Sequence, residues 1–140
     1  MNVLLSIKPK YVEEIMNGNK KYEFRKVIFK CKEDLEMVYI YSSSPVKKIV
    51  GAFVIENIIE DHPEVLWEKF KEFSGINDEM EFFSYFGSNK KGFAIEIRDL
   101  KIFESPADPR ILNPDFIPPQ SFCYMDENFF GGGAVHELSS

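Results

Sequence analysis

One short stretch marks how this 140-residue chain folds: residues 18–25, which read Gly-Asn-Lys-Lys-Tyr-Glu-Phe-Arg. Just before it, over residues 9–16, apolar side chains recur at helical spacing, and Asn17-Gly18 is a typical left-handed helix stop. After the two lysines, apolar and charged side chains alternate, as they do in a half-buried strand. The stretch therefore predicts a helix that turns directly into a β-strand.

Outward from this stretch, several runs have the composition of strands. We predict strands at residues 4–7, 21–29, 37–41, 49–59, 92–103 and 121–125. A second helix is expected after a capping box formed by Asp61 and Glu64, and a third is expected between Asn77 as its cap and Gly87 as its end. The proline-rich residues 105–120 are expected to form an extended arm over the surface.

This order favours an α+β fold. Because helices do not separate every pair of strands, a doubly wound parallel sheet is disfavoured. About six strands, several of them apolar on both faces, fit a small, partly open β-barrel with helices packed on its outside. We predict one domain over residues 1–125 and a flexible C-terminal tail over residues 126–140, which include three consecutive glycines.

Composition limits the class of protein. Hydrophobic residues make up 44% and charged residues 29%, which excludes a disordered chain, and no apolar run is long enough to span a membrane. The N-terminus lacks the pattern of a secretion signal. The two cysteines, Cys31 and Cys123, lie far apart in the sequence without nearby histidines, so no zinc site is expected. We expect a cytoplasmic protein with two free thiols, no metal and no cofactor.

The net charge of -6 hides an asymmetry between the two parts of the chain. Residues 1–50 carry a balance of +4, whereas residues 51–140 carry -10. Such a division is typical of a basic surface on an acidic body, although a solvated face without a partner gives the same count. The lysines expected to follow a phosphate backbone on this surface are Lys8, Lys10, Lys21, Lys26, Lys47 and Lys48.

Three charged residues of the opening stretch are candidates for binding. Glu23 and Arg25 share one face of the predicted strand, and Lys20 lies in the turn before it. Arginine offers a planar fork to a phosphate or a base edge, lysine a mobile positive charge, and glutamate an acceptor for a base N–H. Together they fit a nucleotide site, but an ordinary surface salt-bridge cluster uses the same residue types.

A second group of candidates lies where the third predicted strand ends. Tyr41 is placed to stack on a base, and Ser43, Ser44 and Lys47 are placed to hold a phosphate or a base. Serines before a proline are also common for turn reasons alone. For Tyr39 and Tyr41 the alternative to stacking is a core role for one and a surface role for the other.

The opening stretch resembles the Gly-x-Lys-x-x-Glu-x-Arg signature of ASCH domains, which belong to the PUA-like superfamily. Residues 5–11, 38–51, 66–68, 85–86 and 118–122 resemble further parts of one ASCH subgroup, so that the likeness covers roughly residues 2–125. The resemblance implies a PUA-like β-barrel with a cleft in which Lys20, Glu23 and Arg25 gather. It also implies binding of RNA, often in the regulation of transcription or translation.

The same resemblance leaves an enzymatic alternative open. Some small family members hydrolyse acetylated cytidine, and others are ribonucleases, but the amidohydrolases have a threonine nucleophile where this chain has Glu23. A carboxylate is not a hydroxyl nucleophile, so a hydrolase reading uses Lys20 and Glu23 as an acid–base pair instead. We therefore expect a module that binds single-stranded RNA or a nucleotide. The alternatives are a hydrolase of N-acylated nucleosides or RNA, and a regulator whose acidic helices, over residues 64–81, bind a basic protein.

Overall fold

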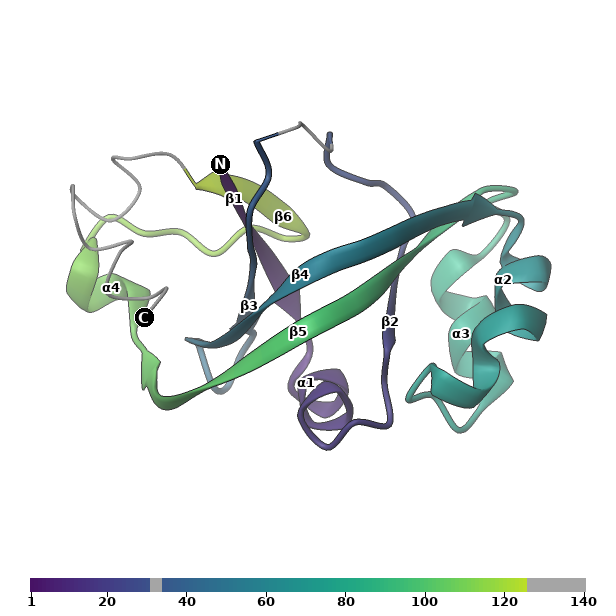
Figure 1. Ribbon diagram of the computed structural model, residues 1–140, viewed down its shortest axis with the longest axis horizontal. Coiled ribbons are helices and arrows are strands. Elements are labelled where there is room, and N and C mark those ends of the chain that lie inside the picture. Colours follow the sequence, from purple (N-terminus) through teal and green to yellow (C-terminus); the bar gives the residue numbers. More distant parts are fainter. Residues whose placement is uncertain (31–33, 126–140) are drawn as a thin grey trace. The chain divides into compact units, whose positions relative to one another are not determined.

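The computed structural model describes residues 1–30 and 34–125 (Figure 1). The predicted C-terminal tail and Cys31 lie outside the described residues. The elements are, in order, β1 (Asn2–Ile7), α1 (Pro9–Met16), β2 (Tyr22–Arg25), β3 (Val38–Ser42), β4 (Lys48–Asp61), α2 (Pro63–Phe70), the 3-10 helix η1 (Lys71–Phe73), α3 (Glu79–Phe86), β5 (Gly92–Ala107), α4 (Pro109–Leu112) and β6 (Phe122–Met125).

The strands form one mixed sheet with the order β2-β5-β4-β3-β1-β6. β1 and β3 are parallel, with Leu5 opposite Ile40, whereas the pairs β1–β6, β2–β5 and β3–β4 are antiparallel. β2 and β6 are the edge strands of this order, so the sheet is open. The prediction of an α+β fold with about six strands is confirmed.

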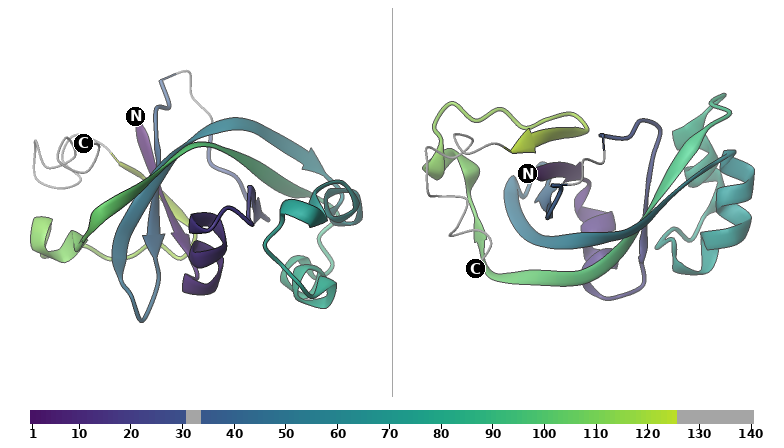
Figure 2. Two further views of the ribbon diagram at one scale, coloured as in Figure 1. Left: turned by 60° about the horizontal axis from the view of Figure 1, so that its bottom comes forward. Right: turned by 45° about the horizontal axis from the view of Figure 1, so that its top comes forward.

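By its internal contacts the chain divides into two compact units. One unit comprises Met1–Val12, Cys31–Val54 and Asp99–Ser140. Within it, β1 lies between β3 and β6, as Figure 2 shows, because the backbone of β1 pairs with both strands. Its hydrophobic cluster contains Leu4, Tyr39, Tyr41, Ile49, Ala52, Phe116 and Met125.

The other unit comprises Glu13–Lys30 and Ile55–Arg98. Its helices α2 and α3 contact each other, and Trp67 of α2 packs on Phe82 of α3 with ring centroids 4.9 Å apart. The start of β5 passes so close to α3 that a Cβ atom at Gly92 would lie 2.5 Å from the Phe86 ring. The buried cluster contains Phe24, Leu66, Trp67, Phe82, Phe86 and Ala94.

Local details of the helix ends differ from the prediction. The cap of α2 is His62, whose Nδ1 accepts the backbone N–H of Glu64, so the expected capping box of Asp61 is wrong. The cap of α3 is Asp78, one residue later than the predicted Asn77, while Gly87 ends this helix as expected. The predicted extended arm begins inside β5 and contains the short helix α4. None of the helices among the described residues has the length and apolar composition that crossing a membrane requires.

Candidate functional site

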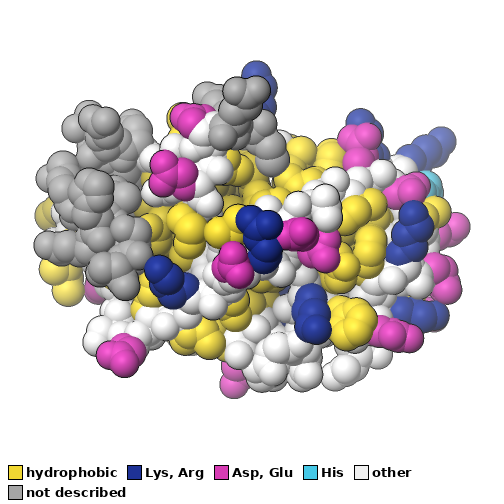
Figure 3. All heavy atoms as spheres, viewed as in Figure 1, with side chains coloured by type: hydrophobic (Ala, Val, Ile, Leu, Met, Phe, Trp, Pro, Cys, Tyr) yellow, Lys and Arg dark blue, Asp and Glu magenta, His cyan; other side chains and the backbone are white. Residues whose placement is uncertain are grey.

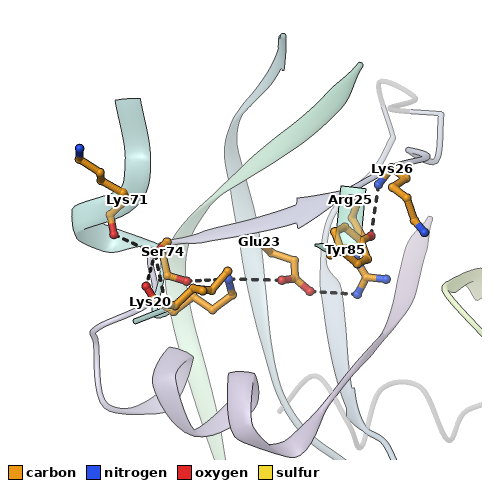
Figure 4. A network of polar contacts seen from close by, with 8 residues as sticks. Lys20, Glu23, Arg25, Lys26, Lys71, Ser74 and Tyr85 are labelled. Atoms are coloured by element: carbon orange, nitrogen blue, oxygen red, sulfur yellow. Dashed lines mark hydrogen bonds and ion pairs between the residues drawn. The ribbon is translucent and has the colours of Figure 1, made fainter. Parts of the chain in front are cut away.

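Three charged side chains of the opening stretch lie in a line inside the second unit (Figure 4). The Lys20 ammonium is 3.6 Å from Oε1 of Glu23, and Nη2 of Arg25 donates a hydrogen bond of 3.0 Å to Oε2 of the same carboxylate. Glu23 is therefore the centre of a cation–anion–cation arrangement. The structure brings together the three residues that the motif singled out.

The local fold explains why these residues meet. Gly18, with φ of 88°, ends α1, and the backbone N–H of Lys20 then donates to the carbonyl of Glu14. β2 follows as the edge strand on β5, with Glu23 opposite Ile95 and Arg25 opposite Phe93. Glu23 and Arg25 are two positions apart on this strand, so they share one of its faces.

The lysine end of the line is closed. Only 1% of the Lys20 side chain is exposed, and its ammonium donates to the carbonyl of Ser74 at 2.8 Å and lies 4.9 Å from the centroid of the Phe24 ring. Burial lowers the pKa of Lys20, and the Glu23 carboxylate opposes that shift. Gly75 permits this packing, because a Cβ atom there would be 2.7 Å from the Lys20 Cβ.

The arginine end is more open. About 10% of the Arg25 side chain is exposed, and Tyr85 of α3 lies beside it (Figure 4). The Tyr85 hydroxyl accepts the backbone N–H of Lys26 at 3.3 Å, and the Lys26 ammonium lies 4.8 Å from the centre of the Tyr85 ring. Burial raises the pKa of Tyr85, while Arg25 and the hydrogen bond from Lys26 act in the opposite direction.

Tyr85 is the neighbour that the motif did not point to. Its sequence signal lies outside the signature: Tyr85-Phe86 is one of the stretches that resemble the ASCH subgroup, more than fifty positions after Arg25. Its exposed fraction is 42%, whereas the helix neighbours Phe82 and Phe86 are almost completely buried. The tyrosine is thus the aromatic residue of this helix that faces both Arg25 and solvent.

The remaining predicted site residues belong to the other unit. Tyr41 is 2% exposed and packs on Phe116 with ring centroids 5.6 Å apart, and burial raises the pKa of its phenol. Ser43 lies in the turn after β3, where its N–H donates to the carbonyl of Ile7. Ser44 and Lys47 are exposed in the same turn. Their part in binding stays a prediction.

Charge on the surface is mixed. On the face drawn in Figure 3, basic and acidic side chains are interspersed, and neither sign forms a continuous field. Exposed charges of the described chain are also paired, such as Arg98 with Glu56 at 2.7 Å and Lys91 with Glu60 at 3.5 Å. Over residues 1–30 and 34–125, no three histidine, cysteine, aspartate or glutamate side chains gather in a way that suits a metal ion.

Comparison with known families gives one match over most of the chain. The sequence model described as the ASCH domain matches residues 5–105. A curated relative named as an ASCH domain-containing ribonuclease, from Zymomonas mobilis subsp. mobilis, is 26% identical over 128 residues, which are 87% of this chain and 82% of that protein.

Another curated relative is much longer than this chain. The ATP synthase subunit alpha of Ureaplasma parvum serovar 3 is 28% identical over 123 residues, which are 88% of this chain but 15% of that protein. This chain therefore spans about a seventh of the length of that relative.

Solved structures agree with the fold. A crystal structure of an ASCH protein from Zymomonas mobilis superposes with a TM-score of 0.82 at 24% identity, covering 91% of this chain and 90% of that chain. The structure of a tyrosine-to-phenylalanine variant of the same protein gives a TM-score of 0.84 at 23% identity and covers 99% and 96% of the two chains. These similarities establish a shared fold.

Proposed function

This chain belongs to the ASCH domain family, whose PUA-like fold it has, and on that premise we propose that it binds RNA, or a nucleotide, through phosphate at the arginine end of the Lys20–Glu23–Arg25 line. A relative with the same domain is named a ribonuclease, which supports RNA as the ligand class. The observation that carries the proposal is the Arg25 guanidinium, which a buried carboxylate holds in place at 3.0 Å. A held guanidinium loses little freedom when it binds a phosphate.

The three residues have different roles in this proposal. Arg25 contacts phosphate, because its side chain is the most exposed of the three. Glu23 orients the guanidinium, as its Oε2 accepts the Nη2 hydrogen bond. Lys20 is a positioning residue, since its ammonium is buried and bonded to the Ser74 carbonyl, where it fixes the Glu23 carboxylate from the other side.

The test is fluorescence anisotropy with a labelled RNA of about ten nucleotides, at several salt concentrations. We expect Arg25→Gln to weaken binding about tenfold to a hundredfold, the range for hydrogen bonds to charged groups. Loss of one phosphate contact makes the negative slope of log K against log salt shallower by about 0.7. Arg25→Lys keeps the charge but not the fork, so we expect an intermediate affinity with an unchanged slope.

The matched control is Arg98→Gln. Arg98 is also an arginine paired with a glutamate, at 2.7 Å, but about half of its side chain is exposed and it lies outside the line of charges. We expect this variant to bind RNA within about twofold of the unchanged protein. An unchanged affinity and slope in Arg25→Gln, or an equal loss in both variants, contradicts the proposed site.

Cleavage of the bound RNA is the second candidate, favoured by the name of the Zymomonas relative. In this candidate Lys20 and Glu23 act as the acid–base pair, which requires the closed lysine end to open when RNA binds. Following RNA length on a gel for an hour distinguishes the two. Glu23→Gln must then abolish shortening, whereas intact RNA with the unchanged protein supports a binding module of the kind that regulates transcription or translation.

A further inference from the structure

We infer that Tyr85 and Lys26 form a base-stacking subsite next to Arg25, so that the ligand is a single strand with an unstacked base and not a duplex. This inference rests on the proposed function and deepens it. The phosphate contact at Arg25 carries no information about the base, whereas an exposed aromatic ring beside it does. The site thereby gains a preference for single-stranded RNA without a preference for one sequence.

The Tyr85 ring is held in place but not covered. Its hydroxyl accepts the Lys26 N–H at 3.3 Å, and the Phe86 ring contacts it edge to face at a centroid distance of 4.9 Å. Even so, 42% of the residue is exposed. A ring fixed at its tip and along one side stacks on a base with little loss of conformational freedom.

The core of the unit does not explain this exposure. Trp67, Phe82 and Phe86 fill the space between α2 and α3, and each is at most 6% exposed. Exposure alone does not single out Tyr85, because Phe73 of the same unit is 44% exposed; the position of Tyr85 beside Arg25 does. A large exposed ring next to a guanidinium has the composition of a nucleic-acid contact.

The Lys26 ammonium can lie either over the Tyr85 ring or beside a phosphate of the ligand. Lys26 follows Arg25 directly, is exposed, and has its ammonium 4.8 Å from the centre of the Tyr85 ring. An exposed cation–π contact is weak, so a base that stacks on the Tyr85 ring displaces the ammonium with little loss of free energy. The displaced ammonium then lies next to the phosphate of that nucleotide, beside the one held by Arg25.

A duplex does not fit this arrangement. In a double helix each base is stacked on both faces and presents only its edges in the grooves. Stacking on Tyr85 requires a base that has left such a stack, which a single strand provides at little cost. Base stacking on an aromatic side chain corresponds to about a fivefold to 150-fold gain in affinity per base.

The experiment compares a ten-nucleotide RNA with an oligonucleotide of the same length and backbone that lacks its bases. Both present the same phosphates, so that any difference in anisotropy titrations reports the bases. We expect the unchanged protein to prefer the RNA with bases by about fivefold or more. We expect Tyr85→Ala to bind both oligonucleotides equally, at the affinity that the unchanged protein has for the abasic one.

Three further variants separate stacking from other roles of these residues. Tyr85→Phe removes only the hydroxyl, so it retains the preference for bases. Lys26→Ala weakens the RNA with bases and lowers the magnitude of its salt slope by about 0.7, but it affects the abasic oligonucleotide less, because no base displaces the ammonium from the ring. Tyr124→Ala is the control, because Tyr124 is a similarly exposed tyrosine, at 37%, on β6 of the other unit, and we expect no effect on either oligonucleotide.

The outcomes are distinguishable. If the unchanged protein binds both oligonucleotides equally, or Tyr85→Ala weakens both to the same extent, the stacking subsite is refuted while phosphate binding at Arg25 stands. If the unchanged protein binds a ten-base-pair duplex more tightly than the single strand, the inferred preference is refuted as well. If it binds none of them at low salt, the proposed function itself fails, and the subsite with it.

Discussion

Replacing the central carboxylate of the charged line, Glu23→Gln, should destabilise the protein far more than replacing the lysine at its end. Glu23 has a cation on each side, at 3.6 Å and 3.0 Å, and all three side chains are at most 10% exposed. Without the carboxylate, Lys20 and Arg25 become two buried like charges with a neutral amide between them. Without Lys20, one well-formed pair remains.

The distances set the size of the effect. At 3.6 Å and an effective dielectric constant of about 20, one such attraction is worth about 5 kcal/mol before desolvation is counted. Breaking buried pairs by removing one partner typically costs about 3–5 kcal/mol, and we expect this range for Glu23→Gln. Lys20→Met loses the bond to the Ser74 carbonyl but also removes a buried ammonium, so we expect about 1–2 kcal/mol.

The double variant gives the sharpest result. Adding Lys20→Met to Glu23→Gln removes one of the two uncompensated cations, so the double variant should be more stable than Glu23→Gln alone. Urea unfolding followed by the fluorescence of Trp67, the one tryptophan, reports all three variants. With a urea dependence of about 2 kcal/mol/M, Glu23→Gln lowers the midpoint by about 1.5–2.5 M. Equal midpoints for the two single variants, or purely additive losses in the double variant, would refute the reasoning.

Three other outcomes follow from the same unit and from the lone described cysteine. Gly75→Ala should lower the free energy of unfolding, measured with urea, more than Gly18→Ala does. Both glycines have positive φ, but only at Gly75 does a new Cβ approach the Lys20 Cβ, at 2.7 Å. We expect a loss of about 1–3 kcal/mol for Gly75→Ala and of about 1 kcal/mol for Gly18→Ala. Because burial lowers the pKa of Lys20, the unfolded chain binds more protons than the folded chain just below pH 10.5. The free energy of unfolding of the unchanged protein, relative to that of Lys20→Met, therefore rises with pH in this range and is flat at lower pH. Parallel urea titrations of the two proteins at several pH values will show this. Burial raises the pKa of Cys123 to about 11, so that about one thiol in a thousand is a thiolate at pH 8. In a Cys31→Ser variant, labelling of Cys123 with a thiol reagent should therefore be slow at pH 8 and should become about tenfold faster with each pH unit. Fast labelling at pH 8 would contradict the burial of this thiol.

Local signals in the sequence were sufficient for much of the fold. The helix over residues 9–16 and its end at Gly18 are as expected, because a left-handed glycine stop acts over one turn of chain. The helix caps were misplaced by one residue, since His62 and Asp78 compete with equally polar neighbours for the same backbone N–H groups. Competition of that kind is settled by backbone geometry and not by residue type.

The inward faces of the helices were harder to predict. Residue type alone would assign Met80 and Phe73 to the core, but they are 71% and 44% exposed. Phe73 belongs to the 3-10 helix η1, whose tighter winding turns its side chains away from the α-helical stripe. Met80 lies in the first turn of α3, ahead of the two buried phenylalanines Phe82 and Phe86, and is not part of their cluster.

By itself, then, the sequence determined that a lysine, a glutamate and an arginine stand at fixed spacing around one helix–strand turn, and that this turn carries an ASCH signature. Only the tertiary structure decided which end of the line is closed and which is partly exposed. Ser74, fifty-four positions after Lys20, takes the ammonium and closes that end, while Tyr85 and Lys26 flank the other. The physical reason is that the burial of a charge depends on segments remote in sequence, which no local spacing encodes.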